Sequence, residues 1–294
     1  MSDARPRGGV LLLTLSLIWF AVTLWSAHAY VSGALDPLFA IIDAARALPD
    51  VLAASILAGA AGALVALSWV PVRAALRWPL AIGVGALVGA VAAGLVLWGY
   101  GHRSSILTLA VSAIVAGAIG GAFGAVKPRE VPAAGVAATL AAFLTDQALH
   151  LFQNPLLGLF GAGDSAATRL AAASRLALTT SLLGGLAAGL VAFWYLRRTG
   201  TTWRFPAYLG AGAVPGAVLL VTELVTRVGG AQLFGLIGNL SDADRTYVEY
   251  TGNSRLNHAL ILLFTGAIVA LLCFGRTLRP TAPTAEPPAK ATVG

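Results

Sequence analysis

Two acidic side chains, Asp146 and Glu223, fall well inside apolar stretches of the sequence and are the first residues that point to chemistry. An ionisable side chain at membrane depth is costly, so each marks a candidate functional site whose partner has to be identified. His150 follows Asp146 by four residues, and Arg227 follows Glu223 by four. Each pair therefore shares one face of a helix.

The chemistry that these residues favour is the binding of a proton or a small cation. A carboxylate among apolar helices takes up a proton more readily than one in water. Arg175 enters another apolar stretch at a similar depth and supplies a counter-charge. The predicted substrate or proton site therefore consists of Asp146, Glu223, Arg175 and His150.

Two alternative roles for these side chains stay open. In the first, they sit near the lipid headgroups, extend to water and pair locally, Asp146 with Arg175 and Glu223 with Arg227. In the second, imidazole and carboxylate groups hold a zinc, copper or nickel ion, although no compact motif such as HExxH is present. The weak candidates for a metal site are His28, Asp146, His150, Glu223 and His258.

No cofactor is predicted. A haem held by His28 and His150 is disfavoured because both residues lie close to a membrane surface. The sequence has no Walker phosphate loop, no nucleophile elbow and no glycine fingerprint after a strand. We therefore assign no catalytic residue, and any transport has to be secondary, passive or powered by a separate subunit.

The elements that position these residues are membrane-spanning helices. The chain is 58% hydrophobic and 11% charged, with a mean hydropathy of +0.83, more than one soluble core can bury. About 20 apolar residues cross about 30 Å of hydrocarbon. Eight runs qualify: Gly9–Tyr30, Val51–Val70, Pro79–Tyr100, Ser104–Val126, Val131–Phe152, Ala172–Leu196, Phe205–Val228 and Asn257–Phe274. The predicted fold is all-α, a polytopic membrane protein with about eight transmembrane helices.

The basic residues predict that both termini are cytoplasmic, because Arg and Lys in short loops resist translocation. Twelve of the nineteen basic residues lie on one side of an eight-span arrangement with three acids, a net charge of 12 − 3 = +9. They are Arg5, Arg7, Arg73, Arg77, Lys127, Arg129, Arg197, Arg198, Arg204, Arg276, Arg279 and Lys290. The predicted location is a bacterial cytoplasmic membrane. The lipid surface accounts for the basic excess without a nucleic-acid partner.

The N-terminal segment has a second interpretation as a cleavable signal peptide. A basic start and an apolar stretch precede Ala27, His28 and Ala29, a pattern that resembles a cleavage site. The apolar stretch, at about twenty residues, is longer than a typical signal sequence. Retention as a first span is therefore favoured.

An internal repeat organises the spans. Ser55–Val70 aligns without gaps on Ser181–Leu196 with seven of sixteen positions identical, and Trp78–Val91 aligns on Phe205–Val218 with seven of fourteen. Corresponding spans run in the same direction, so we expect two parallel four-helix repeats related by an axis along the membrane normal.

The repeats divide the chain into residues 1–127 and 128–278. A short match of 113–116 with 267–270 extends the correspondence into the last spans. The remainder, 279–294, is rich in proline and too short to fold, so we predict a disordered cytoplasmic tail.

Small residues predict how the helices pack. Lipid is as apolar as leucine, so membrane helices associate through close backbone approach at glycine. Gly85/Gly89 and Gly212/Gly216 are GxxxG pairs at equivalent places in the two repeats. Pro215 lies within the second pair and removes a backbone hydrogen bond. Gly212, Pro215 and Gly216 are therefore a predicted hinge, with a static kink as the alternative.

Three functions are compatible with these features. The leading hypothesis is a permease-like protein that handles a small solute or ion by secondary or passive transport. The first alternative is an accessory or scaffold subunit that transports nothing and binds a membrane protein, or a second copy, at its glycine faces or at the polar loop Asp242–Glu249. The second alternative is a membrane-embedded metal or redox enzyme.

Overall fold

The computed structural model consists of α-helices and their connections in the residues that it describes, which are 5–32, 37–71, 73–100, 104–200, 203–229 and 242–277. The helices are α1 (Arg5–Ser32), α2 (Pro37–Trp69), α3 (Ala74–Tyr100), α4 (Ser104–Gly124), α5 (Glu130–Leu151), α6 (Gln153–Leu159), α7 (Ala166–Arg198), α8 (Phe205–Gly229) and α10 (Asp242–Gly275). The predicted tail and the side chains of 230–249 lie outside the described residues. The all-α prediction is confirmed.

Seven of these helices are long and apolar enough to cross a membrane. An eighth crossing is counted if α5 and α6, which meet at a bend of 74°, form one span. Large apolar side chains on the outside of the bundle, such as Leu87 and Trp98 of α3, are 70% and 81% exposed. A broad exposed apolar surface is what contact with lipid requires. The chain is therefore a polytopic membrane protein.

The three longest helices extend well beyond the predicted spans. α2, α7 and α10 contain 33, 33 and 34 residues, about 50 Å each, whereas the hydrocarbon layer is about 30 Å thick. The residues directly before two predicted spans, 37–50 and 242–256, are the first turns of α2 and α10, so the polar segment Asp242–Glu249 is part of a helix and not a loop. A continuous helix satisfies its own backbone donors and acceptors, which an irregular loop near lipid does not.

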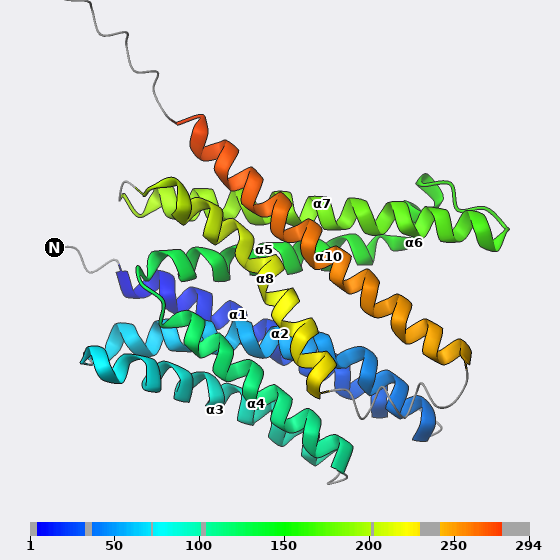
Figure 1. The fold of residues 1–294 in the computed structure, drawn as a ribbon, viewed down its shortest axis with the longest axis horizontal. Helices are drawn as coiled ribbons and strands as arrows, with labels where there is room; N and C mark the ends of the chain where they lie inside the picture. Colours follow the sequence, from blue (N-terminus) through cyan, green and yellow to red (C-terminus); the bar gives the residue numbers. More distant parts are fainter. Residues whose placement is uncertain are drawn as a thin grey trace, which may run out of the picture.

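The helices run between two ends of the bundle (Figure 1). The start of α1 and the end of α10 lie at the same end, where α2 joins α3, α4 joins α5 and α7 joins α8. We call this the basic end, because Arg73, Lys127, Arg197 and Arg276 lie at these helix termini. The other end is called the opposite end.

Backbone contact at glycines brings α2, α3 and α4 together. A Cβ on Gly85 of α3 or on Gly59 of α2 would collide with the backbone oxygen of Gly117 of α4. A Cβ on Gly121 of α4 would collide in the same way with the oxygen of Ala81 of α3. Such approaches place Cα–H groups against carbonyl oxygens and add dispersion contacts along both helices.

The helices α7, α8 and α10 meet in the same manner. A Cβ on Gly212 of α8 would collide with the backbone oxygen of Gly266 of α10, and a Cβ on Gly216 would collide with the backbone of Leu263. A Cβ on Gly189 of α7 would lie 2.7 Å from the Gly266 oxygen. The tight packing predicted for the GxxxG pairs is confirmed.

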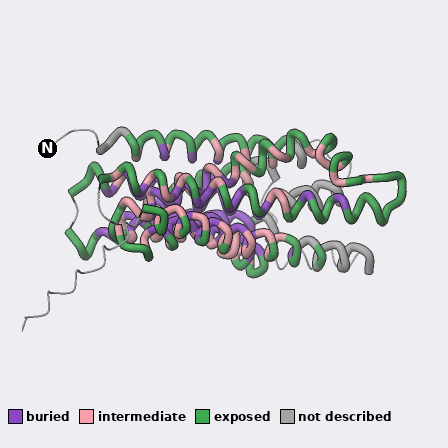
Figure 2. Tube along the Cα trace, turned by 90° about the horizontal axis from the view of Figure 1, so that it is seen from above, coloured by how far each residue is buried: buried purple, intermediate pink, exposed green. Residues whose placement is uncertain are grey.

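The helix α2 lies at the centre of the bundle. Figure 2 shows buried residues gathered along the middle and exposed residues covering the outside. Leu52, Leu57 and Leu67 of α2 are at most 2% exposed. This helix contacts α1, α3 and α4 and also touches α5 and α8. Two helices from later in the chain, α5 and α8, therefore pack against α2.

We expect Gly85→Leu to destabilise the bundle and Gly83→Leu to leave it unchanged. The two glycines belong to the same helix, but a Cβ on Gly83 meets nothing within 4 Å. Overpacking costs about 1–3 kcal/mol or more, which corresponds to a fall in melting temperature of about 5 °C or more in mild detergent. Gly212→Leu and Gly210→Leu repeat the comparison on α8, where Gly210 is equally open. Equal melting temperatures within each pair would contradict the backbone contacts.

Candidate functional site

A cavity of about 530 Å³ opens between α1, α2, α5, α7, α8 and α10. Its polar lining includes Asp50, Asp146, Gln147, Glu223, Arg255 and His258. Glu223 lies six residues before the end of α8, about 9 Å by helical rise. The cavity therefore lies toward the opposite end of the bundle, within the depth of the membrane-spanning helices.

Glu223 carries the most buried charge of the cavity, with a side chain only 6% exposed. The Nε of Arg227 donates to its Oε1 at 3.0 Å, and the Nε of Arg255 donates to its Oε2 at 2.9 Å. Each carboxylate oxygen thus has its own guanidinium, which offsets the cost of burying the charge. The predicted local pair of Glu223 with Arg227 is confirmed. Arg255 is a second partner from a different helix.

The arginine of the cavity is Arg255, whereas Arg175 lies outside its lining. Arg175 is exposed and donates from Nη1 to the backbone oxygen of Phe160 at 3.2 Å. Phe160 directly follows α6, so Arg175 is held by the connection between α6 and α7. The ion pairs of the described residues do not include the alternative pair of Asp146 with Arg175.

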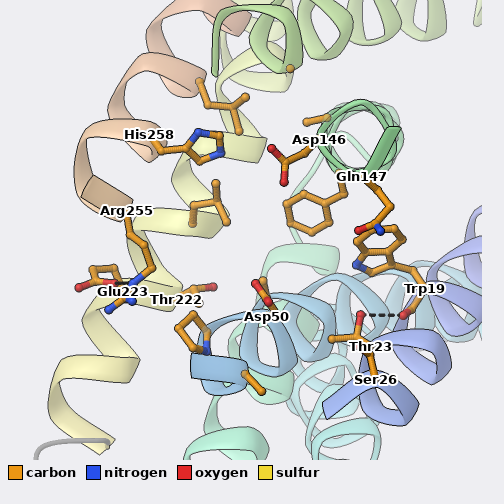
Figure 3. Close-up of a pocket in the computed structure, with 18 of the residues that line it drawn as sticks. Trp19, Thr23, Ser26, Asp50, Asp146, Gln147, Thr222, Glu223, Arg255 and His258 are labelled. Carbon is orange, nitrogen blue, oxygen red and sulfur yellow. Dashed lines mark hydrogen bonds and ion pairs between the residues drawn. The ribbon is translucent and has the colours of Figure 1, made fainter. Parts of the chain in front are cut away.

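Asp50 and Asp146 face one another across the cavity (Figure 3). Asp50 projects from α2 and Asp146 from α5, and both are exposed to the cavity although protein surrounds them. Asp50 lies within electrostatic range of Asp146 and of Arg255. Among the described residues, neither carboxylate makes a hydrogen bond or an ion pair. Two carboxylates are therefore free to bind a ligand.

His258 is oriented at the cavity wall by Ser181. The Ser181 Oγ lies 2.7 Å from His258 Nδ1 and 2.7 Å from the backbone oxygen of Ala177. The hydroxyl has one proton, and a helical serine donates it to the carbonyl four residues earlier. His258 Nδ1 therefore donates to the serine, and Nε2 of the neutral ring remains an acceptor. Asp146 lies within electrostatic range of this ring.

A buried hydroxyl adds a further polar group to the lining. The Oγ1 of Thr222 is buried in the cavity wall, beside Glu223 in the sequence, and has no hydrogen-bond partner. An unsatisfied buried hydroxyl costs about 1–3 kcal/mol.

Comparison of the chain with protein-family models, with curated proteins and with solved structures gave no match. The chemistry of the site therefore has to be argued from its own residues. Carboxylate oxygens, a histidine nitrogen and a hydroxyl can bind a small cation or pass a proton between them.

The other predicted site residues lie apart from this cavity. His150 lines a smaller cavity of about 180 Å³ that shares Asp146 with the larger one. His28 of α1 is exposed, and its ring stacks 6.5 Å from that of Trp98. Within the described part of the chain, no three His, Cys, Asp or Glu side chains gather as metal ligands. Of the five weak metal candidates, Asp146, Glu223 and His258 share the larger cavity.

Sequence reasoning missed Asp50 and the role of Arg255. The predicted span begins at Val51, but α2 begins at Pro37 and carries Asp50 into the cavity. The predicted last span begins at Asn257, whereas α10 begins at Asp242 and contains Arg255. Arg255 and His258 are three residues apart, which places both on one face of a helix. This spacing was the sequence signal that could have identified Arg255 as a cavity residue.

We expect Arg255→Gln to lower the stability of the protein and Arg175→Gln to have little effect. The first change leaves the buried Glu223 with one guanidinium, at a cost of about 1–3 kcal/mol. The second removes one exposed hydrogen bond to a backbone oxygen. The measurement is the melting temperature in mild detergent, and Glu223→Gln combined with Arg255→Gln should recover part of the loss. An equal effect of the two single changes would argue against the double pairing of Glu223.

Proposed function

We propose that this chain is a secondary or passive transporter of a small cation, the proton included, and that Asp50 and Asp146 bind the cargo. The observation that carries the proposal is the presence of two unpaired carboxylates on facing walls of one cavity. Ionisable residues at membrane depth that line a cavity are typical of ion and proton pathways.

The charges around the cavity favour cargo with one positive charge. With every carboxylate ionised, Arg227 and Arg255 against Asp50, Asp146 and Glu223 sum to 2 − 3 = −1. An uncompensated charge among apolar helices is costly. One proton or one monovalent cation brings this sum to zero, so its binding lowers the free energy of the cavity.

The residues differ in their proposed roles. Glu223 fixes Arg255, because both of its oxygens accept hydrogen bonds from arginines. Arg255 is the counter-ion of the cavity and takes the role that the sequence suggested for Arg175. His258 is an additional proton acceptor through Nε2. His150, which the sequence placed in the predicted site, lines the smaller adjoining cavity. Asp146 lines both cavities and is the residue that connects His150 with the proposed site.

The proposal includes two parallel four-helix repeats, residues 1–127 and 128–278. Equivalent glycines make equivalent contacts, which supports this division. Gly59 and Gly85 approach Gly117, and their counterparts Gly185 and Gly212 approach Gly266.

The glycine contacts favour a different alignment of the last helix of each repeat. They pair Gly117 with Gly266, so that Gly117-Ala118-Ile119 corresponds to Gly266-Ala267-Ile268, three identical residues. The sequence match of 113–116 with 267–270 aligns the two helices differently, because it pairs residue 113 with residue 267. The alignment that pairs Gly117 with Gly266 also pairs Ile114 with Leu263. Gly89 approaches Ile114, and its counterpart Gly216 approaches Leu263, so this contact is also equivalent in the two repeats.

Transport through such a site requires alternate opening to the two sides of the membrane. Toward the basic end, Leu57 and Leu64 of α2 pack with Val136 and Leu140 of α5 in a buried apolar cluster that closes the path. In the proposed mechanism, this structure represents the state in which the cavity is accessible from the opposite end and the apolar cluster blocks the basic end.

The hinge formed by Gly212, Pro215 and Gly216 belongs to this proposal. Pro215 is fully buried within α8 and cannot donate to the carbonyl four residues earlier. Gly212 and Gly216 both contact α10 at its backbone. A bend here would move α8 and α10 together, and both helices carry cavity residues.

We further propose that the basic end faces the cytoplasm of a bacterial cell and that the cavity opens outward. The concentration of basic residues at one end supports this orientation under the positive-inside rule. The apolar exterior of the bundle supports the lipid bilayer as its surroundings.

We expect Asp50→Asn and Asp146→Asn to slow cation movement about tenfold or more, because each removes a charged ligand, a loss of about 1.4 kcal/mol or more. The matched control is Asp164→Asn, a change of the same chemistry at an exposed position between α6 and α7. The protein is reconstituted in liposomes, proton, sodium and potassium gradients are imposed in turn, and a dye inside the liposomes that is sensitive to the imposed ion reports its movement.

Two outcomes would contradict the proposal. Wild-type liposomes that behave as empty liposomes under all three gradients would remove transport of these cations. Asp50→Asn and Asp146→Asn variants as active as Asp164→Asn would remove the assigned site. A wild-type protein that is inactive and co-purifies with a second membrane protein would favour the accessory-subunit hypothesis.

A further inference from the structure

The basic end contains a second polar site, separate from the cavity of Asp50 and Asp146. Two adjoining depressions of about 500 and 510 Å³ lie beside the last turn of α2, the start of α3 and the connection from α4 to α5. Arg77, Lys127 and Arg129 line both depressions, which we call the basic pocket. Three cations thus converge where the lipid headgroups of one leaflet would lie.

Arg77 is the unusual member of this group. Its side chain is buried at 8% exposure, and its Nε and Nη2 atoms are covered and have no hydrogen-bond partner. These two nitrogens lie on the same edge of the guanidinium and direct two N–H groups in one direction. This arrangement matches two oxygens of one phosphate or carboxylate group. Leaving such donors unpaired and covered is costly.

The neighbouring residues do not supply the missing acceptor. Glu130 lines the adjoining depression, yet Nε and Nη2 of Arg77 stay unpaired. Arg129 donates from Nη2 to the backbone oxygen of Leu67 and is thereby anchored to the end of α2. Arg129 also lies within electrostatic range of Arg77, so the two positive charges repel one another. A bound anion would relieve this repulsion.

We propose that the basic pocket binds a phosphate group, carried by an anionic lipid headgroup or present as free phosphate. The exposed side chains of Lys127 and Arg129 offer donors to a phosphate, and a rotation of the Arg77 side chain toward the pocket brings its paired donors to the phosphate oxygens. Basic pockets between transmembrane helices at the cytoplasmic surface are suited to anionic headgroups. This site does not depend on the proposed transport function.

The chain contains its own control for this site. Arg77 and Arg204 are equivalent in the repeat alignment. Arg77 directly precedes the aligned segment that begins at Trp78, and Arg204 directly precedes the one that begins at Phe205. Arg204 is exposed, whereas Arg77 is buried in the pocket. Arg77→Gln and Arg204→Gln therefore remove the same charge from equivalent positions, and only the first removes the paired donors.

The experiment is native mass spectrometry of the full-length protein, purified in mild detergent and exposed to phosphatidylglycerol or to phosphatidylcholine. We expect wild type and Arg204→Gln to retain phosphatidylglycerol over phosphatidylcholine, and Arg77→Gln to retain it about tenfold less. Lys127→Gln, at an exposed position, should weaken retention in the same direction. If Arg77→Gln does not fold, the Lys127→Gln variant alone tests whether the basic pocket retains phosphatidylglycerol.

A second arm distinguishes the source of the phosphate group. The melting temperatures of wild type, Arg77→Gln and Arg204→Gln are compared in inorganic phosphate and in chloride at equal ionic strength. Stabilisation by phosphate that is lost only in Arg77→Gln, without selective lipid retention, assigns the site to a free phosphate. Equal lipid retention in all variants together with equal melting temperatures in the two salts would overturn the proposal.

Discussion

Three helices meet at the backbone of one residue, Gly117, and the rest of the bundle depends on that contact. In a lipid environment, apolar side chains gain little by packing on one another, so association relies on close approach and on the weak hydrogen bonds and dispersion that it permits. The side-chain hydrogen of Gly59 and of Gly85 is the largest group that fits against the Gly117 carbonyl. A second meeting point at Gly266 gathers α7, α8 and α10 in the same way.

The glycine contacts also explain where the cavity lies. At several described glycines, an added Cβ would collide with the backbone of another helix. In each case the glycine and that other helix belong to the same half of the chain. The surface between the halves is filled instead by longer side chains, such as Leu57 and Leu64 against Val136 and Leu140. Helices joined through long side chains stand farther apart than helices joined at glycine. The space that remains at the opposite end, where polar side chains replace leucine, is the cavity.

Sequence reasoning reached those features of the fold and site that local spacing determines. The GxxxG pairs indicated the close helix contacts, and the spacing of four residues indicated the pair of Glu223 with Arg227. The partnership of Glu223 with Arg255 joins residues 32 positions apart, and no periodicity within one helix encodes it. Asp50 was missed because the predicted span begins at Val51, directly after it. The helix α2 begins at Pro37 instead, and a continuous helix near lipid satisfies its own backbone groups.

In the proposed transporter, the two carboxylates would couple occupancy of the site to the arrangement of the two halves, because one carboxylate lies in each half. Asp50 belongs to the first half and Asp146 to the second, and with no cation between them their negative charges repel across the cavity. A bound proton or monovalent cation removes this repulsion and allows the two walls to approach. Glu223 does not take part in the same way, because Arg227 and Arg255 already neutralise it. If the chain transports a cation as we propose, neutralisation of these two charges would link binding of the cation to closure of the cavity.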